Sequence, residues 1–355
     1  MSGARHANFN RALVLSLLMM MMTQVGYLES INPWTNGEET LDQSTDVLET
    51  GGAGASNFTA SVEGAELIID EAMTNITFQY NASAANGSTT TTNGNGTTWR
   101  VTDINSGSSN SNPGQYMQIL VGDTIYFDAS DPGSSGVELW AHDTSNASTW
   151  QVADLASGSS SSNPGEYMTI LVGDTLYFSA NDGSSGHELW AHDTSNASTW
   201  RVADIKSGSG SSSPGGYMAI LVGDTLYFDA YDANSGTELW AHDTSNASTW
   251  QVADINSGSG SSSPGAYMAI LVGDTLYFSA NDGSSGHELW AHDTSNASTW
   301  RVADIKSGSG SSSPGGYMAI LVGDTLYFDA YDANSGTELW AHDTSNASTW
   351  QVADI

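Results

Sequence analysis

Cysteine is absent from the 355-residue chain, and lysine and arginine are almost absent. Without cysteine, neither disulfide bonds nor thiolate-bound metal ions can hold the fold together. Only 7 lysines and arginines stand against 40 aspartates and glutamates, so the formal net charge is −33. Nucleic acids and anionic membrane surfaces are bound through basic residues, and the composition therefore argues against both as partners. The expected surface is soluble, self-repelling and attractive to cations.

Charged residues of either sign are also scarce, at 13% of the chain. The remaining polarity comes from Gly, Ser, Thr and Asn, which favour turns and β-structure over helices. A length of 355 residues allows two or three ordinary domains, or one large repeat domain behind a leader.

Long hydrophobic runs are rare, and the longest lies near the N-terminus. Residues 12–22 read ALVLSLLMMMM and follow Arg5 and Arg11, which is typical of a secretory signal peptide; we place it at residues 1–26. The run is shorter than the roughly 20 residues that span a bilayer. An uncleaved anchor that extends to about residue 28 is the alternative. Either interpretation predicts a secreted or cell-surface protein with no membrane span beyond this segment.

Two segments separate this leader from the rest of the chain. Residues 27–60 are acidic and poor in large apolar side chains, so we expect them to form a flexible spacer. Residues 61–98 contain two strand-like runs, 66–69 and 76–80, and then a tract of Ser, Thr, Asn and Gly. A tandem repeat occupies residues 99–355.

The repeat has a period of 50 residues. The segment ELWAHDTSNASTW occurs five times, starting at Glu138, Glu188, Glu238, Glu288 and Glu338. The chain also has a second, longer period, because residues 201–250 are repeated without change as residues 301–350. A period near 50 is typical of propellers and solenoids, and the content of each copy decides between them.

Each copy contains four strand-like runs. In residues 218–230, Gly-Asp joins the apolar run MAILV to TLYFDA and predicts a two-residue hairpin turn of type I′ or II′. TELWAHD and TWQVADI follow and complete an antiparallel meander, which counts against a parallel β-helix. The first run is apolar on both sides and only the last one alternates. This gradient predicts a propeller blade that its neighbours cover on both faces.

The sequence thus predicts an all-β fold, a β-propeller of four-stranded antiparallel blades with about 50 residues per blade. Five full repeats are present. A degenerate or partial sixth is expected from the run TWRVTDI at 98–104 together with residues 65–80. A six-bladed ring and a piece of a longer array remain open as alternatives.

The phrase ELWAHDTS resembles the ELWxxDGT repeat of secreted microbial proteins, over about residues 99–355. Thr-Ser stands where that repeat has Gly-Thr. The order GDTLYF, ELWAHD, TW also resembles the layout of a kelch blade. Neither group has a single activity, so the resemblance implies a propeller fold and an extracellular setting and implies no reaction.

His142, Asp143 and Ser145 supply the residue types of a Ser-His-Asp triad. A triad needs groups brought together from different elements beside an oxyanion hole, whereas these residues are neighbours in every copy. The turn DTSNASTW also departs from the Asp-box of sialidases in spacing and lacks its glycine. The arginines that such enzymes need would lie on separate blades: Arg100, Arg201 and Arg301. We therefore expect the chain not to be an enzyme, with a glycan-processing hydrolase as the alternative.

The acidic loops at 181–188 and 231–238 gather oxygen ligands around glycines, as calcium sites do. The candidate Ca²⁺ ligands are Asp182, Glu188, Asp232, Asn234 and Glu238. Neither loop has the spacing of a true calcium loop, and ordinary turn chemistry is the alternative. No other cofactor is expected.

The triplet Asn-Ala-Ser recurs as a glycosylation sequon in the turn between the third and fourth runs. The candidate glycosylation sites are Asn146, Asn196, Asn246, Asn296 and Asn346. The alternative is an asparagine tolerated in the left-handed conformation of a tight turn.

The copies differ mainly at the end of the blade opposite these sequons, where the loops between second and third runs meet the connections between blades. Binding residues usually lie on loops of a rigid scaffold, so this end is the predicted binding site. The candidate ligand-binding residues are Asp182, His187, Tyr231, Asp232, Tyr331 and Asp332. The predicted function is a secreted or cell-surface binding or adhesion scaffold for an extracellular glycan or protein. A structural surface-layer component is the alternative.

Overall fold

The computed structural model describes residues 57–60, 75–78, 99–106, 108–131, 133 and 135–354. The chain divides into two compact units, 1–93 and 94–355. In the first unit, β1 (Asn57–Ala60) and β2 (Asn75–Phe78) form a parallel pair. Apart from these strands, the segments predicted as signal peptide, acidic spacer and Ser/Thr/Asn/Gly tract lie outside the described residues.

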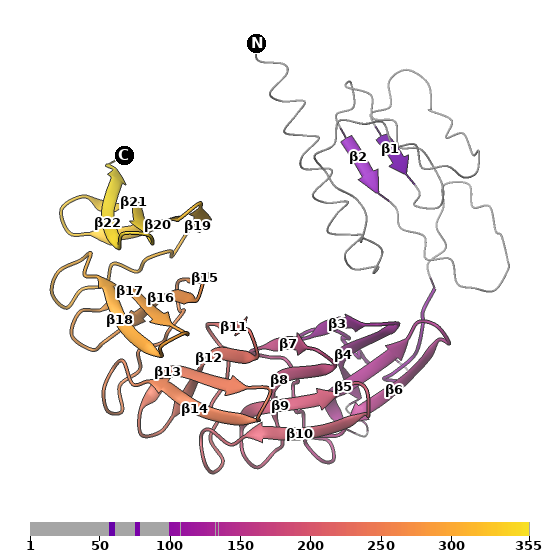
Figure 1. Cartoon of the computed structure of the whole chain (residues 1–355). Helices are drawn as coiled ribbons and strands as arrows, with labels where there is room; N and C mark the ends of the chain where they lie inside the picture. Colours follow the sequence, from indigo (N-terminus) through magenta and orange to yellow (C-terminus); the bar gives the residue numbers. More distant parts are fainter. Residues whose placement is uncertain are drawn as a thin grey trace. The chain divides into compact units, whose positions relative to one another are not determined.

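Five four-stranded antiparallel sheets follow one another in the second unit, each a meander in chain order (Figure 1). We call them blades 1 to 5. Blade 1 is β3 (Gln118–Val121), β4 (Thr124–Asp131), β5 (Gly136–Asp143) and β6 (Ser148–Ala153). Blade 2 is β7 (Thr169–Val172), β8 (Thr175–Asn181), β9 (His187–Asp193) and β10 (Ser198–Ala203). Blade 3 is β11 (Ala219–Val222), β12 (Thr225–Asp232), β13 (Gly236–Asp243) and β14 (Ser248–Ala253).

The last two blades repeat this pattern. Blade 4 is β15 (Ala269–Val272), β16 (Thr275–Asn281), β17 (His287–Asp293) and β18 (Ser298–Ala303). Blade 5 is β19 (Ala319–Val322), β20 (Thr325–Asp332), β21 (Gly336–Asp343) and β22 (Ser348–Ala353). The described residues form no helix. The predicted fold class, an all-β propeller type with four-stranded antiparallel blades, is confirmed.

The hairpin at the start of each blade has the predicted two-residue turn. In blade 3, Val222 pairs with Thr225 across Gly223 and Asp224. Gly223 has a φ of 58°, whereas Asp224 has no positive φ, and a positive φ at the first turn position alone defines type II′. The twist of this turn matches that of the two strands, which is why Gly-Asp recurs in every copy.

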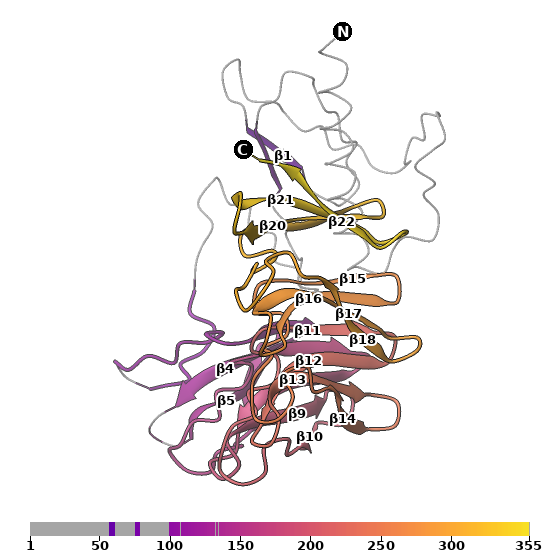
Figure 2. The same ribbon diagram turned by 90° about the vertical axis from the view of Figure 1, so that its left-hand side faces the viewer.

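The core lies between consecutive blades. Met218, Tyr227 and Leu239 of blade 3 pack against Leu276 and Phe278 of blade 4, and equivalent clusters join the other neighbouring pairs. We call the side of a blade that meets the following blade its forward face, and the side that meets the preceding blade its backward face. Figure 2 shows blades 5, 4 and 3 as successive layers from top to bottom. Because burying each large apolar side chain contributes about 1.5–3 kcal/mol, these faces carry most of the stability.

Burial across a blade differs from the predicted gradient. The first strand, β11, is only half buried although it is apolar on both sides, whereas β12 and β13 are buried along most of their length. The reason is position: an edge strand has a neighbour on one side only, so water reaches its side chains past the open edge. The expectation that the outermost strand alone is half exposed is therefore wrong.

Residues 99–104, predicted as the outer strand of a partial sixth blade, form no strand. Trp99 and Val101 are exposed rather than packed between blades. An outer strand needs a third strand beside it to pair with, and the described residues contain none at this point. The described part of the chain therefore contains five blades, without the expected sixth.

Candidate functional site

The loops that differ between copies meet at one end of each blade, as the meander predicts. The N–H of Ser212, in the connection between blades 2 and 3, donates to the carbonyl of His187 at 2.9 Å. The N–H of Tyr231 donates to the carbonyl of Ser212 at 2.8 Å. We call this side, formed by the loops between second and third strands and by the connections between blades, the loop end.

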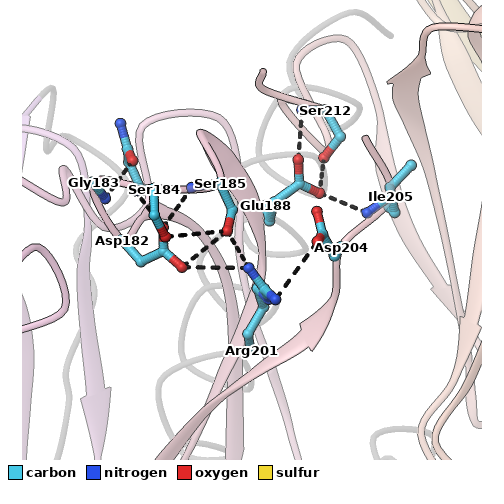
Figure 3. Close-up of polar contacts among 10 residues, drawn as sticks. Asp182, Gly183, Ser184, Ser185, Glu188, Arg201, Asp204, Ile205 and Ser212 are labelled. Atoms are coloured by element: carbon cyan, nitrogen blue, oxygen red, sulfur yellow. Dashed lines mark hydrogen bonds and ion pairs between the residues drawn. The ribbon is translucent and has the colours of Figure 1, made fainter. Parts of the chain in front are cut away.

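Glu188 is fully buried at the loop end and binds the connection that leads to the next blade (Figure 3). Its Oε2 accepts hydrogen bonds from the N–H of Ile205 at 2.8 Å and the hydroxyl of Ser212 at 2.7 Å. Its Oε1 accepts from the N–H of Ser212 at 3.0 Å. Burial raises the pKa of Glu188, and these hydrogen bonds only partly offset that effect. Glu188 is thus a structural acceptor that ties a blade to the following connection.

The same arrangement occurs at Glu238, which accepts from the N–H of Ile255 and from Ser262. Both glutamates were predicted as Ca²⁺ ligands from their place after an acidic loop. The structure shows why the pattern was misleading: a strand alternates its side chains, and this position points into the protein rather than into the loop.

Glu138, the equivalent residue of blade 1, contributes to the pH dependence of stability. Burial raises its pKa from the ordinary 4.5 to about 7, against hydrogen bonds from Ser162 and Leu155. The folded state therefore binds a proton that the unfolded state releases at lower pH. Its contribution to stability is complete below pH 4.5 and is lost as the pH rises through 7.

We expect the free energy of unfolding of the wild type to fall, relative to Glu138→Gln, by between about 1 and 3 kcal/mol from pH 4.5 to pH 8. Urea unfolding of both proteins at the two pH values measures this difference. Every other titrating group is common to the two proteins and cancels. A difference between the two proteins that does not change with pH would contradict the assignment.

Asp182 has different partners from Glu188. It accepts hydrogen bonds from the N–H groups of Ser184 at 2.8 Å and Ser185 at 2.7 Å, and its Oδ2 lies 3.3 Å from Arg201 Nη1. Partial burial raises the pKa of Asp182, but the hydrogen bonds from the two serines outweigh it and lower the pKa. Figure 3 shows Arg201 between the Asp182–Ser185 turn and Asp204, which is 3.6 Å from Nη2.

The predicted Ca²⁺ ligands are therefore not brought together. Asp182 and Glu188 have separate partners, and Asp232 Oδ2 accepts from the side-chain amide and the N–H of Asn234 within their own turn, at 3.3 and 3.4 Å. The described residues contain no group of three or more His, Asp or Glu side chains placed to hold a metal ion. The aspartates accept hydrogen bonds within their own turns, and the glutamates bind the connections to the next blade.

His187, a candidate ligand-binding residue, is nearly buried. Its Nε2 lies 3.4 Å from Glu166 Oε2, and its ring makes an edge-on contact with Tyr167 at 5.3 Å between centroids. Burial lowers the pKa of His187, although the charge of Glu166 opposes this effect. His187 therefore supports an exposed tyrosine rather than offering a free imidazole to solvent.

The remaining candidates belong to blades 3 and 5. The ammonium group of Lys206 lies 5.4 Å from the centre of the Tyr231 ring, and Lys306 lies 4.5 Å from that of Tyr331. Asp332 accepts a hydrogen bond from Asn334 at 3.4 Å, as Asp232 does in its own turn. All six predicted ligand-binding residues thus lie at the loop end, but on separate blades: Asp182 and His187 on blade 2, Tyr231 and Asp232 on blade 3, and Tyr331 and Asp332 on blade 5.

Sequence reasoning missed a row of tyrosines at this end. One tyrosine precedes the first strand of each blade, and those of blades 2 to 5 are exposed: Tyr167, Tyr217, Tyr267 and Tyr317. We call these four residues the tyrosine row. The ring of Tyr167 passes beside Gly216, where a side-chain carbon would be 3.7 Å from its Cδ1. The signal was the recurring Pro-Gly-x-Tyr-Met, which was overlooked because only positions that differ between copies were taken as binding residues.

His142, Asp143 and Ser145 do not form a relay. His142 Nδ1 lies 2.8 Å from the hydroxyl of Thr149, on the neighbouring strand. Asp143 Oδ1 accepts from the N–H of Ser145 at 2.8 Å and from its hydroxyl at 2.6 Å. The histidine and the serine therefore have different partners, as expected from their adjacency.

The sequon turns lie at the opposite end of each blade and are exposed. Asn146 Nδ2 donates to Asp143 at 2.7 Å, and Asn146 Oδ1 accepts from the N–H of Ser148 at 2.9 Å. The left-handed residue is Ala147, with a φ of 59°, and not the asparagine. The alternative explanation of Asn146 as a left-handed residue is therefore wrong, and glycosylation of these sites stays a prediction.

No protein-family model matches the chain, and no curated protein matches it. Among solved structures, puromycin hydrolase is similar at 14% identity and a TM-score of 0.42, over 67% of this chain and 37% of that chain. TolB from Acinetobacter baumannii is similar at 14% identity and a TM-score of 0.33, over 66% and 54%. The nidogen/laminin complex is similar at 10% identity and a TM-score of 0.34, over 65% and 75%.

The expectation that the chain is not an enzyme is corrected by this comparison, because the similar structures include a hydrolase. The chain spans less than two thirds of the puromycin hydrolase and TolB chains. Identities this low concern the fold alone, and no reaction passes from these proteins to this chain. The part of the chain that the structure describes contains no helix with the length and hydropathy of a membrane span.

Proposed function

We propose that this chain is an extracellular propeller-type scaffold that binds glycans through the tyrosine row. The observation that carries the proposal is the exposure of one tyrosine at the same place in successive blades, with 54% of Tyr217 accessible to solvent. Recurrence of the exposed ring in register suits a ligand that is itself a repeating chain.

Chemistry at the loop end fits a sugar. A tyrosine ring offers a flat apolar surface for the C–H face of a pyranose, and its hydroxyl remains free to bond. Binding sites combine such apolar surface with a few placed polar groups. The loop end supplies such a group beside Tyr167, where Glu166 Oε2 lies 3.4 Å from Nε2 of His187, whose ring contacts the tyrosine.

Charge narrows the ligand class. A formal net charge of −33 repels polyanionic glycans, so the favoured ligands are neutral polysaccharides. The signal-like segment at 1–26 and the resemblance to ELWxxDGT repeats of secreted proteins support an extracellular setting for such binding.

The test is gel mobility and array binding with soluble neutral polysaccharides. Combined replacement Tyr217→Ala and Tyr267→Ala is expected to weaken binding about 10-fold or more, because each lost stacking contact contributes about 1 kcal/mol. Trp250→Ala, at an exposed aromatic of the outer strand, is the control and should bind as the wild type does. If the wild type binds none of the neutral polysaccharides, the proposal is overturned and a structural surface role is favoured. If Trp250→Ala loses as much affinity as the double tyrosine variant, the tyrosine row is not the binding site.

A further inference from the structure

The position after Pro-Gly, just before each tyrosine, differs between blades. From blade 1 to blade 5 it holds Gln115, Glu166, Gly216, Ala266 and Gly316. In blade 3, a Cβ at Gly216 would lie 3.5 Å from the carbonyl oxygen of Ser213 and 3.6 Å from Oδ2 of Asp229. It would also lie 3.7 Å from Cδ1 of Tyr167, which belongs to blade 2. Because Gly216 is exposed, these groups border a space that is open to solvent, and we call such a space a glycine notch.

A second glycine notch, between blades 4 and 5, has the same geometry. A Cβ at Gly316 would lie 3.7 Å from Oδ2 of Asp329 and 3.7 Å from Cδ1 of Tyr267. Blade 4 has neither the glycine nor the aspartate, because Ala266 and Ser279 stand at these positions. The two notches therefore belong to blades 3 and 5, which are two blades apart in the chain.

The two carboxylate oxygens of Asp229, a residue that is 2% exposed, have different roles. Oδ1 accepts hydrogen bonds from the N–H groups of Tyr217 at 2.8 Å and Met218 at 2.9 Å, whereas Oδ2 faces the glycine notch. In blade 1, where Gln115 replaces the glycine, the equivalent oxygen, Asp128 Oδ2, is buried without a hydrogen-bond partner. The glycine of blade 3 instead leaves Oδ2 beside a space that a ligand can enter.

The glycine notch offers hydrogen-bond acceptors and a negative charge. The carboxylate of Asp229 and the carbonyl of Ser213 accept hydrogen bonds and donate none. Burial raises the pKa of Asp229 to about 6, so this carboxyl group is ionised at neutral pH but poorly solvated. A hydroxyl group has one hydrogen and satisfies only one of the two acceptors. A primary ammonium group donates three hydrogen bonds and carries the opposite charge, so it matches the notch better.

We propose that each glycine notch binds a primary ammonium group of a glycan, so that amino sugars are preferred among the glycans that stack on the tyrosine row. The inference rests on the proposed function, because Tyr167 and Tyr267 belong to that row. A pyranose ring stacked on Tyr167 brings a ring substituent over Gly216, since Cδ1 of Tyr167 borders the notch. The formal net charge of −33 favours the same ligands, because it attracts cations and repels polyanions.

The experiment compares the hexasaccharides of glucosamine and N-acetylglucosamine, which differ only in acetylation, by titration calorimetry of the full chain at neutral pH. The wild type is expected to bind the glucosamine hexamer about 10-fold more tightly, because hydrogen bonds between an ammonium group and a carboxylate are stronger than neutral ones. The N-acetylated hexamer measures stacking on the tyrosine row alone. Equal affinity for the two hexamers would overturn the notch proposal and leave the tyrosine row intact, whereas binding of neither hexamer would count against both.

Gly216→Ala combined with Gly316→Ala fills both notches. The preference for glucosamine is expected to disappear, while the N-acetylated hexamer binds as before. This double variant should fold, because neither glycine has a positive φ and Ala266 already occupies the position in blade 4. Ala266→Gly is the matched control, since it opens a space beside Ser279 rather than a carboxylate, and it should leave the preference unchanged. A preference that survives in the double alanine variant would overturn the proposal.

Asp229→Asn combined with Asp329→Asn tests the charge without filling the space. The amide oxygen still accepts from the N–H groups of Tyr217 and Met218, and the amide nitrogen places a donor in the notch. The preference for glucosamine should therefore be lost in this variant as well, and its persistence would contradict a role for the carboxylate.

A lysine hexapeptide separates the two sources of an ammonium group, a glycan and a protein. Because the peptide has no pyranose ring to stack on the tyrosine row, it is expected to bind the wild type and the double alanine variant equally. If the double alanine variant loses affinity for the peptide as it does for the glucosamine hexamer, the notch binds amines of proteins and its assignment to a glycan is wrong.

Discussion

Gly236→Ala is expected to lower the free energy of unfolding by about 2–5 kcal/mol, whereas Gly336→Ala should lower it by only about 1 kcal/mol. Both glycines have a positive φ, 75° and 85°, so alanine is strained at each. A Cβ at Gly236 would also lie 2.2 Å from the carbonyl oxygen of Gly260, in the connection to blade 4. A Cβ at Gly336 would meet nothing within 4 Å.

This pair separates backbone strain from close packing, because the surrounding sequence is the same in the two blades. Urea unfolding followed by tryptophan fluorescence, at low protein concentration, measures both losses. Equal losses would mean that the connection moves aside at Gly236 and that the close approach is not rigid. A larger loss at Gly336 would contradict the packing of blade 3 against the following connection.

Glu238→Ala is expected to cost about 3–5 kcal/mol of stability. The carboxylate is fully buried and accepts from the N–H of Ile255 at 2.8 Å and from the N–H and hydroxyl of Ser262 at 2.8 and 2.6 Å. Alanine removes this acceptor from the N–H of Ile255, leaves Ser262 with only the carbonyl of Thr237, and opens a cavity beneath the connection. Glu238→Gln keeps the volume and one acceptor oxygen, so it should cost less.

The control is Asp224→Ala, an exposed carboxylate in the hairpin turn of the same blade, which should change stability by no more than about 0.5 kcal/mol. Urea midpoints of the three variants at pH 7 give the ranking. If Glu238→Ala costs no more than Asp224→Ala, the carboxylate does not hold the connection.

Local pairing explains how much of the fold the sequence predicts. The Gly-Asp turn, the alternation in the outer strand and the fixed period all report contacts between residues close in the chain, and these gave the correct blade. Burial of β11 was misjudged because the pattern of β11 shows its apolar side chains but not its place at the open edge of the sheet.

Longer contacts explain the errors at the site. Asp182 and Glu188 are six residues apart and looked like one ligand group, yet Glu188 binds Ser212, which lies in the next connection. The exposure of the tyrosine row depends in the same way on how neighbouring blades cover one another. An identical sequence therefore behaves differently in two places, as Met218 and Met318 show.

By itself, the sequence determined the strand order within a blade, the turn types that Gly-Asp can form, and the negative net charge that disfavours anionic ligands. Each of these follows from neighbours in the chain or from composition, so no distant contact is needed to derive it. Only the tertiary structure decided that the glutamates of the repeat bind the connections between blades and that the tyrosines of blades 2 to 5 are exposed at the loop end. These properties depend on which blade packs against which. Repeats with the same sequence do not show which neighbour each of them contacts.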